Sequence, residues 1–406
     1  MTRRIFTAAV GVALLHALDD AFVGRQPGVD LDQHAVAALV SVVVAAGAIL
    51  AFGRVRPGVR AALAVGLGVP ALVNGAMHVV HVDFQGLERS DLTGVLAAVA
   101  GIVLIGLGAA IPWLGRAERS RRPWVTRAVA LPAGFLFAFV LVLPVGMAVM
   151  ETHKPREDVS SPPNAAFADV SFESTDGLRL SGWYRPPRNG ATVLVIHGGG
   201  GDRTGAMDHA KLLDRHGYGV LMYDARGRGE SEGTPNSYGW DWERDAAGAM
   251  RWLHAQPGAG RIGALGLSSG ADTVVDLAAH DASVAAVVTD GLALRTMEDA
   301  ENLDGGLKTE SLTGWLMFQA VGVMSGSEPS EPLQELVPRI HAPLLMISAG
   351  ESAERDYNEL YAEVANEPFE HWNLPEAGHT SAVRDEPAEY ERRVTRFLDA
   401  ALLSGR

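Results

Sequence analysis

RIGALGLSSGADTVVDLAA, residues 261–279, joins an apolar run to a helical pattern through a turn of small residues. Residues 262–267 have the continuous apolar character of a buried strand, and residues 271–279 have the pattern of a helix. Between them, Gly266-Leu267-Ser268-Ser269-Gly270 matches the G-x-S-x-G pattern, in which a serine occupies a strained strand-to-helix turn. Because glycine leaves room for such a turn, we expect the Ser268 hydroxyl to lie exposed at a sheet edge.

Strand and helix patterns alternate through the rest of the C-terminal half. A hairpin is expected from 169–174 and 178–185 around Asp176-Gly177. Further strand candidates are 192–196, 219–223, 284–289, 343–347 and 369–374, and helices are expected at 240–254 and 387–403. This alternation predicts an α/β fold in which helices cover both faces of a mostly parallel sheet, with ligands at the carboxyl ends of the strands.

Charge divides the chain of 406 residues near position 150. The first part has 12 basic and 8 acidic residues, a net charge of +4, whereas the second has 22 basic and 40 acidic residues, a net charge of −18. An acidic second part argues against binding to nucleic acid or to an anionic lipid surface. There is no cysteine, which excludes disulfides, thiolate zinc sites and cysteine nucleophiles.

The first 150 residues are expected to form a transmembrane region of about five helices. A span takes about 20 apolar residues. Four runs of this kind lie at about 35–53, 61–82, 92–114 and 128–150.

A fifth run, 5–23, is apolar but contains His16, Asp19 and Asp20. A carboxylate at a span's centre costs about 2.5–3.5 kcal/mol, although both aspartates lie near the outer end of this run. A signal peptide is the alternative, since Arg3 and Arg4 precede a short apolar core, but no convincing cleavage site follows before Arg25.

The connections between the runs alternate in charge. Arg3 and Arg4, then Arg54, Arg56 and Arg60, and then Arg116, Arg119, Arg121, Arg122 and Arg127 mark the basic segments, whereas Asp30 and Asp32, and then Asp83, Glu88 and Asp91, mark the acidic ones. By the positive-inside rule the basic segments are cytoplasmic, so the chain after residue 150 is expected on the extracytoplasmic face of the cell membrane.

Polar residues within these runs fall on helical faces. His16 and Asp20 are four residues apart, and Asn74, His78 and His81 share one face. We favour interhelical hydrogen bonding over a proton or metal site, and no metal or organic cofactor is assigned.

A glycine-rich loop, His197-Gly198-Gly199-Gly200-Gly201, follows an earlier strand. Without side chains, its backbone N–H groups can approach a ligand oxygen, and the amides of Gly199, or of a neighbour, and Ser269 are candidates for an oxyanion hole. A plain flexible turn or a phosphate loop is the alternative, but there is no Walker motif.

A histidine in Ala377-Gly378-His379-Thr380 follows the expected strand 369–374. A neutral imidazole that reaches Ser268 can take its proton and return it to the leaving group, provided that a carboxylate fixes the tautomer. The chain order of serine, acid and histidine is typical of the α/β fold described above.

Residues from about 168 to 405 resemble the α/β-hydrolase superfamily, nearest to its serine-aminopeptidase-like and dienelactone-hydrolase-like branches. Besides the three motifs above, residues 223–231, YDARGRGES, are similar to the D-x-R-G-x-G-x-S stretch of that superfamily. The resemblance implies that Asp224 and Arg226 fix a loop beside the site. Cap segments of the superfamily occupy the slot at 295–340, and a helical excursion with a merely structural role is the alternative there.

The acid of the implied triad departs from the superfamily's pattern. Relatives tend to have aspartate three residues after a glycine that closes the seventh strand, but the third residue after Gly350 is Ala353. We prefer Glu354 because of its position in the loop, with Asp356 and Glu351 as alternatives.

The expected domains are a transmembrane region at 1–150, a Pro-rich linker at 151–166 and a hydrolase domain at 167–406. The expected function is hydrolysis of an ester, amide or thioester of a small molecule or peptide through an acyl-serine intermediate, with the lipid bilayer as a partner. The alternative is a catalytically silent binding or sensing module attached to a polar-lined bundle.

Overall fold

The computed structural model describes residues 1–22, 31–85, 89–114, 140, 143–152, 159–303, 308–350 and 352–404. The chain divides into two compact units. The first comprises Met1–Met150 and Lys308–Met324, and the second comprises Glu151–Leu307 and Ser325–Arg406. Most of helix α11 (Lys308–Ser325), which lies within the expected cap segment, therefore belongs to the N-terminal unit.

The N-terminal unit is helical. Besides α11, its helices are α1 (Thr2–Phe22), α2 (Leu31–Phe52), α3 (Pro57–Gln85), α4 (Arg89–Leu114) and α6 (Leu143–Thr152), which ends at the start of the second unit. The first four of these helices coincide with the apolar runs expected at 5–23, 35–53, 61–82 and 92–114. Most of the run at 128–150, and residues 153–158 of the expected linker, lie outside the described residues.

Two of the described helices are long and apolar enough to cross a membrane, at Pro57–Gly75 in α3 and Leu92–Ile111 in α4. Within the same described part of the chain, Ser41–Phe52 and Leu312–Ser325 are shorter apolar helices. The number of spans in the N-terminal unit therefore stays a prediction.

Helices α3 and α4 approach each other closely at glycines. A Cβ atom on Gly75 would fall 2.3 Å from the Ala98 nitrogen, and one on Gly101 would fall 2.5 Å from the Leu72 nitrogen. Membrane helices associate through small residues of this kind, because van der Waals packing between backbones replaces the hydrophobic effect.

A chain of polar side chains links α1, α3 and α4. Asn74 Nδ2 donates to His16 Nε2 at 3.2 Å, so the His16 proton is on Nδ1, which lies 3.2 Å from Thr93 Oγ1. Thr93 in turn donates to Asp19 Oδ2 at 2.7 Å. His16 is buried, and these contacts are of the interhelical kind that the sequence favours. The side chains of Asp20, His78 and His81 lie outside the described residues.

The second unit contains the predicted residues Ser268, Glu354 and His379 and is called the catalytic unit below, after that prediction. It is built on one sheet of eight strands in the order β1-β2-β4-β3-β5-β6-β7-β8. The strands β1 and β2, and β2 and β4, pair antiparallel, and the other pairs are parallel. The strands are β1 (Ala168–Glu173), β2 (Arg179–Arg185), β3 (Ala191–Ile196), β4 (Gly219–Tyr223), β5 (Arg261–Leu267), β6 (Val284–Asp290), β7 (Leu344–Ala349) and β8 (Phe369–Leu374).

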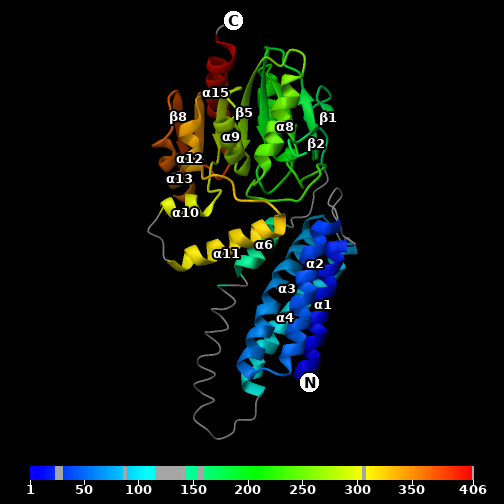
Figure 1. The fold of residues 1–406 in the computed structure, drawn as a ribbon. Coiled ribbons are helices and arrows are strands. Elements are labelled where there is room, and N and C mark those ends of the chain that lie inside the picture. The colour runs from blue at the N-terminus through cyan, green and yellow to red at the C-terminus, as the bar shows by residue number, and fades with distance from the viewer. Residues whose placement is uncertain are drawn as a thin grey trace. The chain divides into compact units, whose positions relative to one another are not determined.

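Helices cover both faces of this sheet, and alternate strand residues point into two separate cores. Leu194 and Ile196 of β3 belong to one core, whereas Val193 and Val195 belong to the other. The first core includes residues of α8 (Trp242–His254), α9 (Ser269–His280), α12 (Leu333–Leu336) and α13 (Ser352–Ala362), and the second includes residues of α7 (Met207–Arg215) and α15 (Pro387–Leu398). Figure 1 shows α8 and α9 in front of the strands.

Short elements complete the catalytic unit. They are η2 (Arg203–Ala206), α10 (Met297–Leu303), η3 (Val337–Arg339), α14 (Ala382–Asp385) and η4 (Asp399–Leu403).

The predicted strands and the hairpin are confirmed, with ends that differ by at most two residues. The hairpin register pairs Glu173 with Arg179 across Gly177, whose φ of +89° favours glycine. Helix α8 begins at Trp242 instead of residue 240, because Gly239 and Asp241 both have a left-handed backbone with φ of +70° and +65°.

The glycine contacts between α3 and α4 generate a matched pair of variants. Gly101→Val should destabilise the N-terminal unit by about 1–3 kcal/mol, because the added atoms must displace the α3 backbone. Gly106→Val is the control, since a Cβ at this position of the same helix meets nothing within 4 Å. Thermal unfolding of the full chain in mild detergent measures both, and equal midpoints for the two variants would contradict the packing described here.

Candidate active site

Ser268 occupies a strained turn between β5 and α9, with φ of 52° and ψ of −124°. The two glycines of the motif have no room for a side chain. A Cβ on Gly266 would fall 2.0 Å from the Gly270 oxygen, and one on Gly270 would fall 2.4 Å from the Ile196 oxygen. The turn places Ser268, half-buried, at the carboxyl end of β5 and at the N-terminus of a helix, where the helix dipole favours negative charge.

The glycine-rich loop after β3 lies against this serine. A Cβ on Gly198 would fall 3.3 Å from Ser268 Cβ, and one on Gly199 would fall 2.7 Å from Ser269 Oγ and 2.0 Å from the Ser237 oxygen. Ser269 Oγ also donates to the Ser237 oxygen at 2.5 Å. The structure thus brings together the two residues, Gly199 and Ser269, whose amides the sequence nominates as oxyanion donors.

His197 orients this loop. Its Nε2 accepts the Ala225 N–H at 3.1 Å, so the ring proton is on Nδ1, which donates to the Gly198 oxygen at 2.7 Å. The C=O and N–H of a trans peptide point in opposite directions, so this bond turns the Gly199 N–H away from the imidazole. Burial lowers the pKa of His197 to about 4, which keeps the ring neutral at physiological pH.

Arg228 and Ser237 hold the same loop, and the sequence analysis did not identify either of them. Arg228 is buried, and its Nη2 donates to the Gly199 oxygen at 2.6 Å and to Ser237 Oγ at 2.7 Å. Arg228 lies in the stretch 223–231, so its place beside Arg226 in that motif was a signal that could have found it. Ser237 follows the motif in an irregular loop and carries no sequence signal.

Asp224 and Arg226 make the loop-fixing contacts that the resemblance implies. The Asp224 carboxylate accepts the backbone N–H groups of Arg203 at 2.8 Å and Glu230 at 2.9 Å. The Arg226 guanidinium donates to Asp245 at 2.7 Å and to Asp176 at 2.9 Å. Buried charges are stable when they are paired and hydrogen-bonded in this way, and neither residue touches Ser268 in these contacts.

His379 lies on the loop after β8 and pairs with Glu354. The Nδ1 atom of His379 is 2.6 Å from Glu354 Oε2, while Glu354 Oε1 accepts the Ala349 N–H at 2.6 Å. Because Nδ1 carries the proton that the carboxylate accepts, Nε2 of a neutral His379 ring carries the lone pair that can accept a proton. The Glu354 side chain is 7% exposed and that of His379 is 40% exposed, so the carboxylate is fixed and the imidazole is open to a substrate.

The other two candidate acids are placed differently. Asp356 pairs with its neighbour Arg355, with Nη2 2.8 Å from Oδ1, and Glu351 lies outside the described residues. The expectation that Glu354 lies in a loop was wrong, because α13 already begins at Ser352. Glu354 is therefore in the first turn of the helix, and Asn358, one turn further on, ties that turn to the Leu292 oxygen at 2.7 Å.

Ser268 and His379 converge at the end of β6. The Ser268 N–H donates to the Asp290 oxygen at 2.9 Å. The next residue is Gly291, where a Cβ would fall 2.8 Å from Cε1 of His379. Serine, histidine and carboxylate therefore come from the segments that directly follow β5, β8 and β7, all at the carboxyl edge of the sheet, as the fold class predicts.

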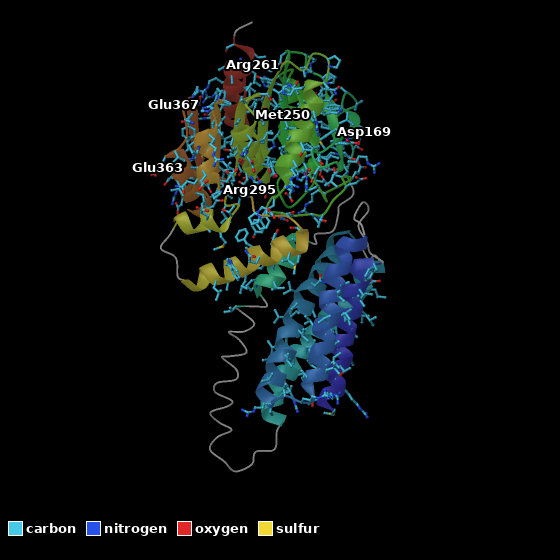
Figure 2. All side chains as sticks on the ribbon, viewed as in Figure 1. Asp169, Met250, Arg261, Arg295, Glu363 and Glu367 are labelled. Atoms are coloured by element: carbon cyan, nitrogen blue, oxygen red, sulfur yellow. The ribbon has the colours of Figure 1, made fainter. Side chains whose placement is uncertain are left out.

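A buried carboxylic acid lies one helical turn after the serine. Burial raises the pKa of Asp272 to about 7, and the positive charges of Arg295 and of protonated His379 act against this rise. Arg295 is fully buried on the loop after β6 and pairs with Asp276 at 2.5 Å. Figure 2 shows Arg295 at the opposite end of the catalytic unit from Arg261, which begins β5. The buried charged residues Asp272, Asp276 and Arg295 therefore lie near the end of the sheet that carries Ser268.

Comparisons with known proteins agree with this fold. Residues 160–391 match the family model of the X-Pro dipeptidyl-peptidase (S15 family). The uncharacterized protein MT2364 of Mycobacterium tuberculosis is 29% identical over 269 residues, which cover 64% of this chain and 89% of that protein. The thiohydrolase aneE of Aspergillus aculeatus is 31% identical over 130 residues, which cover 30% of this chain and 41% of that protein.

Among solved structures, the esterase Pf2001 of Pyrococcus furiosus superposes with a TM-score of 0.50 at 23% identity, covering 61% of this chain and 97% of the esterase. This likeness shows the α/β-hydrolase fold. Together the matches define the class of protein as a serine hydrolase. The chain belongs to the S15 family.

The contacts of His197 predict how its loss differs from the loss of His379. His197→Ala should lower kcat by about 10²-fold, the low end of what losing one oxyanion donor costs, because the Gly198–Gly199 peptide would lose its orientation. The acidic limb of the pH–rate profile should not move, since His197 titrates only near pH 4. Initial rates with a chromogenic short-chain ester between pH 5 and 9 measure both quantities, and a shifted acidic limb would show that His197 takes part in proton transfer.

Proposed function

We propose that this protein is a membrane-anchored serine hydrolase that cleaves an ester, amide or thioester through an acyl-serine intermediate. Ser268 is the nucleophile, His379 the general base and Glu354 the acid that fixes the imidazole tautomer. The observation that carries the proposal is the 2.6 Å contact between His379 Nδ1 and Glu354 Oε2, since it leaves Nε2 as the proton acceptor. No metal or organic cofactor takes part in the proposed reaction.

The proposed reaction has two halves. His379 Nε2 takes the proton of Ser268 Oγ as this oxygen bonds to the substrate carbonyl carbon, and the amides of Gly199 and Ser269 stabilise the oxygen that becomes negative. The imidazolium then returns the proton to the leaving alcohol, amine or thiol as its bond to carbon breaks. Water repeats the sequence on the acyl-serine, which releases the carboxylic acid and restores Ser268.

The membrane anchor is supported by two observations on the N-terminal unit. The apolar segments at Pro57–Gly75 and Leu92–Ile111 are long enough to span a bilayer. The basic residues Arg54, Arg56 and Arg60 cluster in the connection between α2 and α3, which the positive-inside rule places in the cytoplasm. On this topology the catalytic unit faces the outside of the cell.

Ser268→Ala tests the nucleophile. The variant should lose on the order of 10⁶ in kcat, because nothing else in a triad of this kind can form the acyl intermediate. Hydrolysis of a short-chain p-nitrophenyl ester measures this. Ser283→Ala is the control, because the hydrogen bonds of this serine among the described residues are with His254 and within the Asp281–Ser283 turn. Undiminished turnover in Ser268→Ala would contradict the proposal.

Glu354→Gln tests the acid. It should lower kcat by up to about 10⁴-fold, because an amide opposite Nδ1 favours the wrong imidazole tautomer. Asp356→Asn is the matched control, since Asp356 is two residues away in the same helix and pairs with Arg355 instead. A larger loss in Asp356→Asn than in Glu354→Gln would move the acid's role to Asp356.

Topology can be tested with single cysteines, since the natural chain has none. Ala282→Cys places a thiol at an exposed position of the catalytic unit, and Arg56→Cys places one in a basic connection. A membrane-impermeant maleimide added to intact cells or spheroplasts should label the first variant at once and the second only after the membrane is opened. Labelling of Arg56→Cys on intact cells, with Ala282→Cys labelled only after the membrane is opened, would contradict the proposed orientation.

A further inference from the structure

Helix α11 has an exposed apolar stripe. Leu312, Trp315, Gln319 and Val323 recur at intervals of three or four residues and so lie along one face of the helix. Three of the four are large and apolar, and their exposed fractions are 45%, 50% and 74% for Leu312, Trp315 and Val323. Phe318 and Val321 are buried, so α11 is anchored by one face and presents the other.

A stripe of this composition is unsuited to water. The exposed face of a helix in a water-soluble protein is normally polar, and contiguous exposed apolar side chains mark a binding surface. Gln319 is the only polar residue in the stripe, and the stripe carries no charge. Tryptophan is enriched where a bilayer meets water, because its ring is apolar and its N–H can remain hydrated. The chemistry of the stripe therefore suits a lipid surface.

The unit to which α11 belongs also favours a lipid bilayer as the partner of the stripe. Residues Lys308–Met324 form one compact unit with Met1–Met150, which contains the two segments long enough to span a bilayer. Helix α4 of this unit has a comparable exposed stripe at Leu92, Leu96, Val99 and Ile102, each more than half exposed. Because α4 and α11 belong to the same unit and both expose apolar side chains, a bilayer that surrounds α4 is the partner we expect for the α11 stripe as well.

The last residue of α11, Ser325, already belongs to the catalytic unit and is hydrogen-bonded within it. Where the helix ends, Ser325 Oγ accepts a hydrogen bond of 3.2 Å from the amide of Asn236, which is fully buried. The next residue is Ser237, whose oxygen accepts from Ser269, the neighbour of the nucleophile.

The segment that leaves the N-terminal unit is tied to the same residue. Glu151, the first residue of the catalytic unit, accepts hydrogen bonds from the N–H of Ser237 at 3.1 Å and from its Oγ at 3.0 Å. The two residues at which the chain leaves the N-terminal unit, Glu151 and Ser325, are therefore hydrogen-bonded to Ser237 and Asn236 beside the glycine-rich loop.

We propose that α11 contacts the bilayer and that the substrate is the long-chain acyl ester of an amphiphile taken from the lipid phase. This inference rests on the proposed hydrolase function and names its substrate class. An acyl chain that stays in the bilayer until it is cleaved needs an apolar surface attached to the active-site loops, and α11 supplies that surface. The products are a fatty acid, released from Ser268 by water, and the alcohol of the amphiphile.

The test compares two substrates on the full chain reconstituted in phosphatidylcholine vesicles. A triple variant with Leu312→Ser, Trp315→Ser and Val323→Ser should hydrolyse p-nitrophenyl palmitate held in the vesicles at least about tenfold more slowly, which corresponds to about 1.4 kcal/mol. Its rate with water-soluble p-nitrophenyl acetate should stay within about twofold of wild type. Lys211→Ser, at an exposed position of α7 outside the stripe and the active site, is the control and should change neither rate.

Equal losses on both substrates would show that the stripe only supports the fold, and unchanged rates on both would show that it does not handle lipid; either result overturns the proposal. Tryptophan quenching by brominated phosphatidylcholine gives a second, activity-independent readout. The quenched fraction should fall in Trp315→Phe, and an unchanged fraction would also overturn the proposal. A wild-type chain that hydrolyses neither ester would refute the hydrolase function, while the quenching would still decide whether α11 meets lipid.

Discussion

The backbone at Ser268 can adopt its left-handed turn only because glycines on both sides let three chain segments meet. Gly266 packs against the carbonyl of Gly270, and Gly270 packs against the carbonyl of Ile196 at the end of β3. Any side chain at these positions would separate β5 from α9 or α9 from β3. This close packing fixes Ser268 beside the glycine-rich loop, and the rest of the site depends on it, because oxyanion donors act only when they are held in place before the reaction.

The two histidines near that turn, His197 and His379, have environments that suit different roles. His197 is buried and stays neutral, so it can orient a peptide without competing for protons. His379 is partly exposed and faces a fixed carboxylate, which suits a ring that must gain and lose a proton. Arg228 and Ser237 join the glycine-rich loop to Glu151, and Asn236, the neighbour of Ser237, donates to Ser325. Glu151 and Ser325, the first residues after the two segments of the N-terminal unit, thus belong to the hydrogen-bond network around the glycine-rich loop.

The sequence predicts much of the fold, because period-two hairpins, buried apolar strands and the G-x-S-x-G turn are local patterns. It also nominates Ser268, His379 and Glu354, which the structure places at one edge of the sheet, with Glu354 against His379. It could not predict that Glu354 begins a helix, since residues 351–354 suit a loop and a first helical turn equally well. Arg228 and Ser237 were missed because their contacts with Gly199 join distant segments and leave no periodic signal. The grouping of α11 with the first 150 residues is likewise a tertiary property, and the number of membrane spans stays a prediction from hydropathy.

The central claim is that Ser268 is the one serine activated for covalent chemistry. Peptide mass spectrometry after brief exposure of the detergent-solubilised full chain to a fluorophosphonate tests it directly, because only a serine whose proton is removed by a base reacts quickly. We expect a single stoichiometric adduct on the peptide that contains Ser268, and no adduct after heat denaturation. An adduct on Ser269 or another serine, or no adduct on the folded chain, would contradict the account.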